Sequence, residues 1–142
     1  MKKKIILWAV IIIVALALLI QLIPLPGRGN NPAVIAEPNW DSPQTRALVK
    51  RACFDCHSNE TVWPWYSYIA PVSWLVYSDA IEGRSRLNFS EWNRPQIGSG
   101  EITSFIQEGE MPPSIYLPMH PSARLTSAEK QQLITGLMNS LP

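Results

Sequence analysis

The sequence predicts an all-α protein in which one apolar helix precedes a small domain of short helices and long loops. Three observations lead to this fold class. The chain opens on an uninterrupted apolar run, helix start and stop signals recur along the remainder, and no alternating strand pattern of useful length occurs. Thirteen prolines among 142 residues favour short helices and many loops over long helices.

Residues 1–25 are predicted to form a transmembrane anchor. Three lysines at positions 2–4 precede an apolar run of about nineteen residues, which as a helix spans roughly 28 Å and matches a hydrocarbon core. The lysines favour a cytoplasmic N-terminus, so the rest of the chain is expected on the periplasmic or other extracytoplasmic side of the cell membrane. A cleaved signal peptide is the alternative, but the run is long and the nearest small-residue site, Val34-Ile35-Ala36, lies too far downstream.

The rest of the chain divides into a linker and one domain. Residues 26–42 are rich in proline, glycine and asparagine and are expected to be extended and flexible. Residues 43–142 are expected to fold as a single domain. The formal net charge of +1 argues against nucleic acid as a partner, because phosphate binding needs a clustered basic face.

Helix signals in residues 43–142 place several short helices. Each signal is a capping residue or a proline at the start of a helix, or a glycine at its end. They predict a helix from Pro43 toward Cys53 and a second from Pro71 that ends before Gly83. A turn from Ser90 through Trp92 and a helix over 101–107 that stops at Gly109 are expected next. The last helix begins with a capping box from Thr126 to Glu129 and carries an apolar stripe at Leu133, Ile134, Leu137 and Met138.

Cys53-Phe54-Asp55-Cys56-His57 forms the pattern Cys-x-x-Cys-His, which indicates covalent attachment of one haem c. The two thiols add across the haem vinyl groups, and His57 becomes the proximal iron ligand. A zinc site is a rival, but it needs a fourth ligand, and His120 is the one further histidine. A redox Cys-x-x-Cys usually lies in a βαβ unit, a pattern that this sequence lacks.

An electron carrier needs a second axial ligand, and Met111 is the preferred candidate. It lies between the end of a short helix and two prolines that stiffen the following loop. His120 and Met119, in the same long loop, are the alternatives, and a vacant or water-bound position is a third. Met138 lies on the apolar stripe of the last helix and is expected to be a core residue.

Several blocks of the sequence, taken in order, resemble the bacterial haem-binding domain family, from about Pro43 to the C-terminus. The resemblance implies a small cytochrome-c-like domain of the cell envelope that binds one c-type haem and transfers electrons. The blocks are Cys53-x-x-Cys56-His57-Ser58-Asn59-Glu60-Thr61, Trp63-Pro64-Trp65-Tyr66-Ser67, Ala70-Pro71-Val72-Ser73-Trp74, Gly109-Glu110-Met111-Pro112-Pro113, Tyr116, His120-Pro121 and Ala123-x-Leu125.

The aromatic block around Trp63, Trp65 and Tyr66 is expected to form the wall of the haem pocket, because flat rings exclude water from a porphyrin. Ordinary core packing is the alternative. The second ring nitrogen of His57 needs an acceptor, for which the carbonyls before or at Pro64 or Pro71 are candidates.

Arg84 and Arg86 are candidate partners of the haem propionates, although two arginines in a loop are more often solvated. Together these features predict an electron carrier rather than an enzyme, with an unidentified redox partner protein in the envelope. A five-coordinate haem sensor, or a small haem enzyme acting on a diatomic gas or peroxide, is the main alternative, but no distal histidine–arginine pair is recognisable. A zinc-binding structural domain is a third reading.

Overall fold

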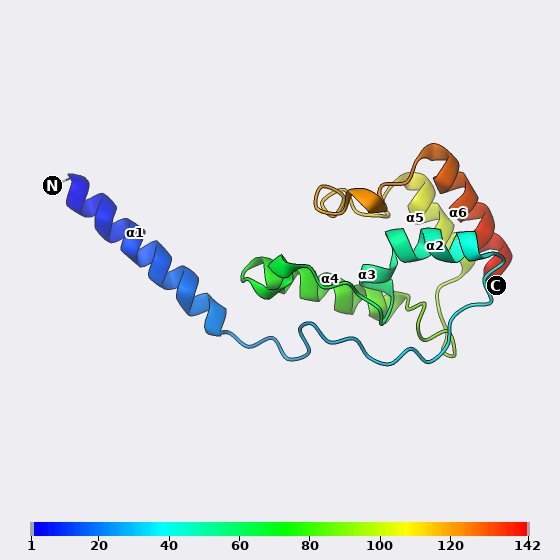
Figure 1. Cartoon of the computed structure of the whole chain (residues 1–142), viewed down its shortest axis with the longest axis horizontal. Helices are drawn as coiled ribbons and strands as arrows, with labels where there is room; N and C mark the ends of the chain where they lie inside the picture. Colours follow the sequence, from blue (N-terminus) through cyan, green and yellow to red (C-terminus); the bar gives the residue numbers. More distant parts are fainter. Residues whose placement is uncertain (1, 142) are drawn as a thin grey trace. The chain divides into compact units, whose positions relative to one another are not determined.

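The computed structural model describes residues 2–141, and within that range it is all-helical and contains no strand (Figure 1). The predicted fold class is therefore confirmed. An isolated bridge joins Ala36 and Glu91. The helices are α1 (Lys2–Leu19), η1 (Ile20–Leu22), α2 (Pro43–Ala52), α3 (Phe54–His57), η2 (Trp65–Tyr68), α4 (Val72–Arg86), α5 (Ser99–Glu108), η3 (Pro121–Ala123) and α6 (Ser127–Ser140).

The chain forms two compact units. The N-terminal unit holds the described residues up to Asn30 together with Trp63–Asp79. The core unit holds Asn31–Val62 and the described residues from Ala80 on. The division of the chain into anchor, linker and domain stays a prediction.

The N-terminal apolar helix has the length and composition of a membrane span. Lys2–Leu22 contains 21 residues, and none of the described residues of α1 is buried within the protein. At 1.5 Å per residue the segment reaches about 30 Å, the thickness of a hydrocarbon core. It is therefore either a membrane anchor or a signal sequence.

In the core unit, α2 and α5 both pack against α6. Gly136 of α6 lies so close to Thr45 of α2 that a Cβ at position 136 would collide with the Thr45 side chain. The aromatic rings of Trp40, Phe54 and Trp92 each contact the ring of Phe89. The apolar core comprises Leu48, Val49, Phe54, Leu87, Phe89, Ile102, Ile106, Leu133, Ile134, Leu137 and Leu141.

Three of the predicted helix boundaries are confirmed. The Ser42 hydroxyl accepts a hydrogen bond from the Thr45 N–H and caps α2. Helix α5 ends at Gly109, whose φ of 80° is left-handed and suits glycine. Thr126 forms the predicted capping box at the start of α6.

Two expectations about α4 and α6 are wrong. Helix α4 does not end before Gly83 but continues to Arg86, so Arg84 and Arg86 lie in its last turn rather than in a loop. Met138, expected in the core, is 52% exposed, because the buried side of α6 is centred on Leu133 and Leu137.

The segment from Asn31 to Trp40 carries contacts that a free linker would lack. The N–H groups of Ile35 and Ala36 donate to the Ser90 carbonyl, and the Trp92 N–H donates to the Ala36 carbonyl. These bonds tie residues 35–36 to the core unit. Mobility of the remaining linker stays a prediction.

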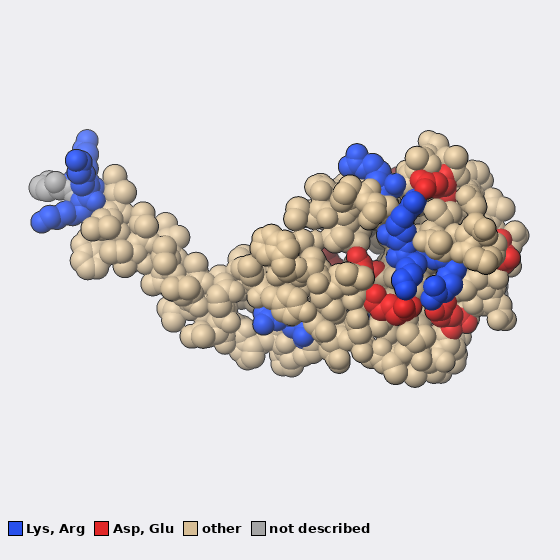
Figure 2. Space-filling model, in the orientation of Figure 1, with Lys and Arg blue, Asp and Glu red and all other residues tan. Residues whose placement is uncertain are grey.

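The charges of the folded part are mixed in sign. Figure 2 shows acidic and basic groups side by side there, whereas α1 carries only its N-terminal lysines and no acidic residue in its first turn. Arg46 pairs with Glu37 at 2.6 Å, Lys50 with Glu60 at 3.1 Å and Arg51 with Glu129 at 2.6 Å. Each of these three basic side chains therefore has an acidic partner.

Candidate functional site

The Cys-x-x-Cys-His motif follows directly on α2. Cys53 ends that helix, with its N–H donating to the Val49 carbonyl at 2.8 Å. One further turn, α3, then forms, because the N–H groups of Cys56 and His57 both donate to the Cys53 carbonyl. Cys53 and Cys56 thus stand three positions apart on one helical turn, and neither is in a disulfide. The predicted placement at the C-terminal end of a helix is confirmed.

Phe54 fixes this turn to the core. Its side chain is 1% exposed and stacks on Phe89 with ring centroids 6.0 Å apart. The Phe89 N–H also donates to the His57 carbonyl at 2.8 Å. Apolar burial on one side of the turn therefore sets the positions of the two thiols and the imidazole.

The imidazole of His57 is oriented by carbonyls at the end of α4. Its Nδ1 lies 3.1 Å from the Gly83 carbonyl oxygen and 3.2 Å from that of Leu87. The Gly83 carbonyl also accepts the Leu87 N–H at 2.9 Å, and the Nδ1 proton is shared between the carbonyl oxygens of Gly83 and Leu87. That tautomer leaves Nε2 as the nitrogen with a lone pair for a metal ion.

The expected acceptors for His57, the carbonyls before or at Pro64 or Pro71, are therefore wrong. The error follows from the position of α4, which was expected to stop before Gly83. Since the helix continues to Arg86, Gly83 in its last turn supplies one acceptor, and Leu87, directly after the helix, supplies the other.

Gly83 allows α4 to lie against the attachment motif. A Cβ at this position would collide with the Cys56 carbonyl oxygen and would lie 3.1 Å from the Cys56 Cβ. Any larger residue would push the helix away and lengthen the His57 hydrogen bonds. A glycine within a helix costs about 1 kcal/mol relative to alanine, and here close approach of two backbones offsets that cost.

Burial changes the acid–base properties of the motif. It lowers the pKa of His57, although the hydrogen bonds to Leu87 and Gly83 partly oppose the effect. It also raises the pKa of the Cys53 thiol to about 12, with a further contribution from neighbouring Cys56. At neutral pH the motif thus presents a neutral imidazole and a protonated Cys53 thiol.

A buried arginine holds the loop that follows His57. Arg84 donates from Nε to the Ser58 carbonyl at 2.8 Å and from Nη2 to Thr61 Oγ1 at 2.8 Å and Asn31 Oδ1 at 2.9 Å. Arg84 is thus a buried structural residue of this loop, and solvation, the alternative to the expected propionate contact, does not apply to it. Arg86 is exposed and pairs with Glu82 at 2.8 Å. A contact of either with a propionate stays a prediction.

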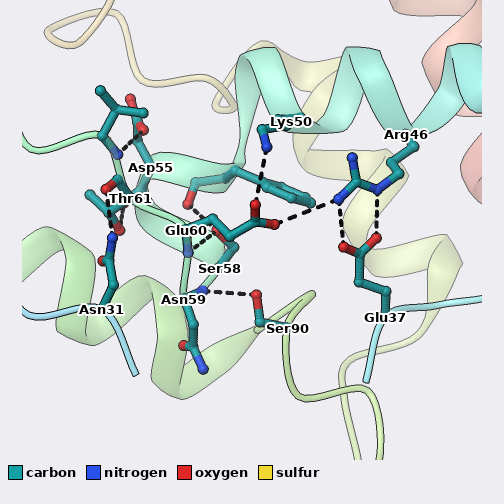
Figure 3. A network of polar contacts seen from close by, with 12 residues as sticks. Asn31, Glu37, Arg46, Lys50, Asp55, Ser58, Asn59, Glu60, Thr61 and Ser90 are labelled. Carbon is teal, nitrogen blue, oxygen red and sulfur yellow. Dashed lines mark hydrogen bonds and ion pairs between the residues drawn. The ribbon is translucent and has the colours of Figure 1, made fainter. Parts of the chain in front are cut away.

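The same loop belongs to a wider polar network, drawn in Figure 3. The Asn59 N–H donates to Ser90 Oγ at 2.9 Å, and the Ser58 hydroxyl donates to the Phe54 carbonyl at 2.8 Å. Thr61 Oγ1 donates to the Asp55 carbonyl at 2.8 Å. Each bond satisfies a buried or half-buried polar group, so residues 58–61 are joined to the helical turn before them and to Ser90.

The candidates for the distal ligand lie in the loop after α5. The Met111 N–H donates to the Phe105 carbonyl at 3.1 Å, which fixes its backbone to the end of α5. The side chains of Met111 and Met119 are both exposed, at 36% and 58%. His120 stacks on Tyr116 with centroids 3.8 Å apart. The choice of Met111 over Met119 and His120 stays a prediction.

Tyr116 and Asp55 form a contact that sequence reasoning missed. The Tyr116 hydroxyl donates to Asp55 Oδ2 at 2.6 Å, while Asp55 Oδ1 accepts from the Val62 N–H at 2.9 Å. The loop that carries Met111 is thus hydrogen-bonded to Asp55, one of the two residues between the cysteines. A tyrosine in a loop and an acidic residue inside the motif gave no signal of this pairing.

The aromatic block lies in the N-terminal unit, with Trp65 and Tyr66 in η2 and Trp63 before that helix. The rings of Trp65 and Tyr66 meet edge to face at 5.7 Å, and Trp65 is 71% exposed, whereas Trp63 is half-buried. Because Trp65 is so exposed, it is not a core residue of this unit. The role of Trp63, Trp65 and Tyr66 as a pocket wall stays a prediction.

Comparison with known proteins gives one match. The model of the haem-binding domain family matches residues 15–139, which includes the motif, η2, all of α4 to α5 and nearly all of α6. No curated protein and no solved structure matches the chain. Among residues 2–141, no group of three or more His, Cys, Asp or Glu side chains could hold a metal ion.

Proposed function

Because the chain belongs to the haem-binding domain family, we propose that it is a membrane-anchored c-type cytochrome that carries one covalent haem and transfers electrons in the bacterial envelope. Cys53 and Cys56 would hold the haem, and His57 would be the proximal iron ligand. Each thiol adds its sulfur and its hydrogen across one vinyl double bond, so attachment consumes no oxidant.

The orientation of His57 is the observation that carries this proposal. Two carbonyl acceptors on Nδ1 select the tautomer whose Nε2 binds iron, and they also make the imidazole a stronger donor. The arrangement is costly to build, since it needs Gly83 against Cys56. A histidine with a purely structural role would not need its second nitrogen kept for another partner.

Met111 is the proposed distal ligand. A thioether opposite an imidazole favours Fe(II) and raises the reduction potential relative to two imidazoles. The Met111 loop is held at one end by the Phe105 carbonyl and further along by Tyr116 on Asp55. A ligand on so constrained a loop would move little between the two oxidation states, which suits electron transfer to an envelope partner protein.

The apolar helix supports the proposed location. As an uncleaved anchor it would leave the lysines at positions 2–4 in the cytoplasm and the haem domain on the exported side. Haem is attached to Cys-x-x-Cys-His motifs outside the cytoplasm, so this orientation would place the motif on the side where attachment occurs.

Acid–acetone extraction followed by a pyridine haemochrome spectrum tests the proposal. Haem should remain with the protein and show the spectrum of two saturated vinyl positions, and the reduced protein should be low-spin. Cys53→Ser and Cys56→Ser should each remove one thioether bond and lower the yield of holoprotein.

The chain's two histidines provide a matched pair of variants. His57→Ala should lose the low-spin spectrum, while His120→Ala should keep it. Haem that passes entirely into the solvent phase would contradict covalent attachment. A high-spin wild-type spectrum would instead favour the five-coordinate sensor or enzyme.

A further inference from the structure

We propose that residues 68–75 rest on the lipid bilayer beside the exported end of α1, with their apolar side chains in the headgroup region. Tyr68, Ile69, Val72 and Leu75 form this surface, here named the interfacial surface. The inference rests on the proposed membrane anchor and concerns only the N-terminal unit, to which all of these residues belong. It assigns a lipid partner to the exposed apolar side chains of this segment.

The interfacial surface is apolar and open. Its four side chains each keep between 45% and 51% of their surface exposed. Val72 and Leu75, three positions apart on α4, share one face of that helix. Several large apolar side chains exposed within eight residues of each other mark a contact with another molecule or a membrane.

The composition around the interfacial surface favours lipid over a charged protein partner. Residues 61–78 contain no charged side chain, although charged residues make up 16% of the chain. The same eighteen residues hold three of the six tryptophans and three of the four tyrosines. Tryptophan and tyrosine are the residues that gather where a membrane meets water, because their rings are apolar and their edges polar.

Gln21 connects the interfacial surface to the membrane span. It is the one amide side chain in the apolar run, and it lies at the end of Lys2–Leu22. Its Nε2 donates to the Ala70 carbonyl at 3.0 Å, and its Oε1 accepts from the Ala70 N–H at 2.9 Å. Ala70, between Ile69 and Val72, is therefore held at the depth where the span leaves the bilayer.

The two hydrogen bonds between Gln21 and Ala70 also satisfy backbone groups that would be costly to leave without partners near lipid. Residues 69–71 lie between η2 and α4. The Ile69 N–H donates to the Tyr66 carbonyl, and the carbonyls of Ile69 and Pro71 accept from the N–H groups of Ser73 and Trp74, whereas both backbone groups of Ala70 bond to Gln21. Backbone polar groups without partners are costly near hydrocarbon, and Gln21 satisfies both groups of Ala70.

Three further contacts hold residues 68–77, which include the interfacial surface, to the chain that follows the span. Arg28 lies over the Tyr68 ring at 5.7 Å and donates to the Tyr68 carbonyl at 3.4 Å. The Tyr77 hydroxyl donates to the Pro26 carbonyl at 2.6 Å. Arg28 is a cation in the region where lipid phosphates lie, and such a residue stabilises the protein at an anionic surface.

Photocrosslinking of the full-length holoprotein tests this surface. The photoreactive amino acid p-benzoylphenylalanine replaces Leu75, and the protein is reconstituted in vesicles of phosphatidylethanolamine and phosphatidylglycerol. Met138 is the matched control, because it also lies on a helix and is 52% exposed against 51% for Leu75. Ile12, in the middle of α1, reports on the anchor itself. Haem staining shows that each variant is folded.

We expect lipid adducts at positions 12 and 75 and none above background at position 138. Adducts at 12 without adducts at 75 would overturn the interfacial surface and leave the anchor intact. Adducts at 75 without adducts at 12 would overturn the proposed anchor but keep a lipid-bound surface. Adducts to protein or haem at position 75, or equal lipid adducts at positions 75 and 138, would also overturn the proposed lipid contact of the interfacial surface. If the variant at 75 does not fold, the probe at Val72 gives the same test.

Discussion

The phenol of Tyr116 donates a 2.6 Å hydrogen bond to Asp55 Oδ2, across 61 positions of sequence. Asp55 stands between the two cysteines of the motif, and Tyr116 stands in the long loop that carries Met111. The bond therefore connects the two sides from which we propose that iron is coordinated. Its acceptor is a carboxylate that also binds the Val62 N–H, so the acceptor cannot move freely.

Removal of this hydroxyl should loosen the distal loop. In Tyr116→Phe we expect a loss of about 1–2 kcal/mol in the free energy of unfolding, since a half-buried bond to a carboxylate is broken. If Met111 binds the iron, the far-red charge-transfer band of the ferric protein should also weaken. Urea unfolding and the ferric absorption spectrum measure the two effects.

Tyr77→Phe is the matched control, because the Tyr77 hydroxyl bonds to Pro26 in the N-terminal unit. It should leave the far-red band unchanged. A Tyr116→Phe protein with wild-type stability and an unaltered band would show that the loop is held in another way.

Gly83→Ala should disturb the proximal side. The new Cβ would collide with the Cys56 carbonyl, so α4 must shift and the Nδ1 bonds of His57 must lengthen. We expect a destabilisation of about 1–3 kcal/mol, typical of overpacking, and less haem per protein. Thermal unfolding and haem content measure both.

Gly100→Ala provides the comparison, because a Cβ at position 100 in α5 meets no atom within 4 Å. Alanine there should stabilise the helix by about 0.5–1 kcal/mol. Opposite signs at the two glycines would confirm that the close contact, and not glycine content, matters. Equal effects would refute it.

The contrast between Gly83 and Gly109 shows what a sequence can predict. Both glycines were expected to end helices, and only Gly109 does. A terminating glycine and one needed for close approach look the same in a single sequence, because the difference lies in a partner, Cys56, that is 27 positions away.

Features that depend on neighbouring residues were predicted correctly more often than features that depend on residues far apart in the sequence. The caps at Ser42 and Thr126 and the motif itself depend on residues within four positions of each other, and the caps are confirmed. The acceptors of His57 depend on how α4 packs against α3, which no local pattern encodes. The role of Arg84 was missed for the same reason.

Arg84→Gln should destabilise the protein far more than Arg86→Gln. Arg84 satisfies the Ser58 carbonyl and Thr61 Oγ1, both in buried residues, and truncation would leave these acceptors without their charged donor. We expect a loss of about 2–3 kcal/mol at Arg84 and under about 0.5 kcal/mol at exposed Arg86. Urea unfolding measures both, and similar values would contradict the structural role of Arg84.

Glu129 should contribute to the acid sensitivity of the fold. Hydrogen bonding to the Thr126 N–H, then the bond from Arg51, lowers the pKa of its carboxyl from 4.5 to about 2. The unfolded chain therefore takes up a proton at a higher pH than the folded one. The stabilisation is complete above about pH 4.5 and is lost as the pH falls toward 2.

Glu129→Gln should thus flatten the dependence of the urea midpoint on pH between those values. Arg51→Gln should retain most of it, because the Thr126 N–H is the larger cause. An unchanged slope in Glu129→Gln would mean that other carboxyls account for the acid sensitivity.

Met111→Ala is the test of the distal ligand. The Met111 N–H bonds to the Phe105 carbonyl at the end of α5, which holds the backbone from which the Met111 side chain extends. We expect the far-red band of iron–thioether bonding in the oxidised wild-type protein and its loss in Met111→Ala. Met111→His should keep low-spin iron but lower the reduction potential, because imidazole stabilises Fe(III) better than a thioether.

Met119→Ala and His120→Ala separate the rivals. Met119 is more exposed than Met111 and should leave the band intact. The ring of His120 stacks on Tyr116, and its Nδ1 lies 3.1 Å from the Tyr116 carbonyl, so His120→Ala should weaken the loop without changing the spin state. A band that survives Met111→Ala, together with a spin change in His120→Ala, would instead establish two imidazole ligands. Electron transfer would then occur at a lower potential, with a different class of partner.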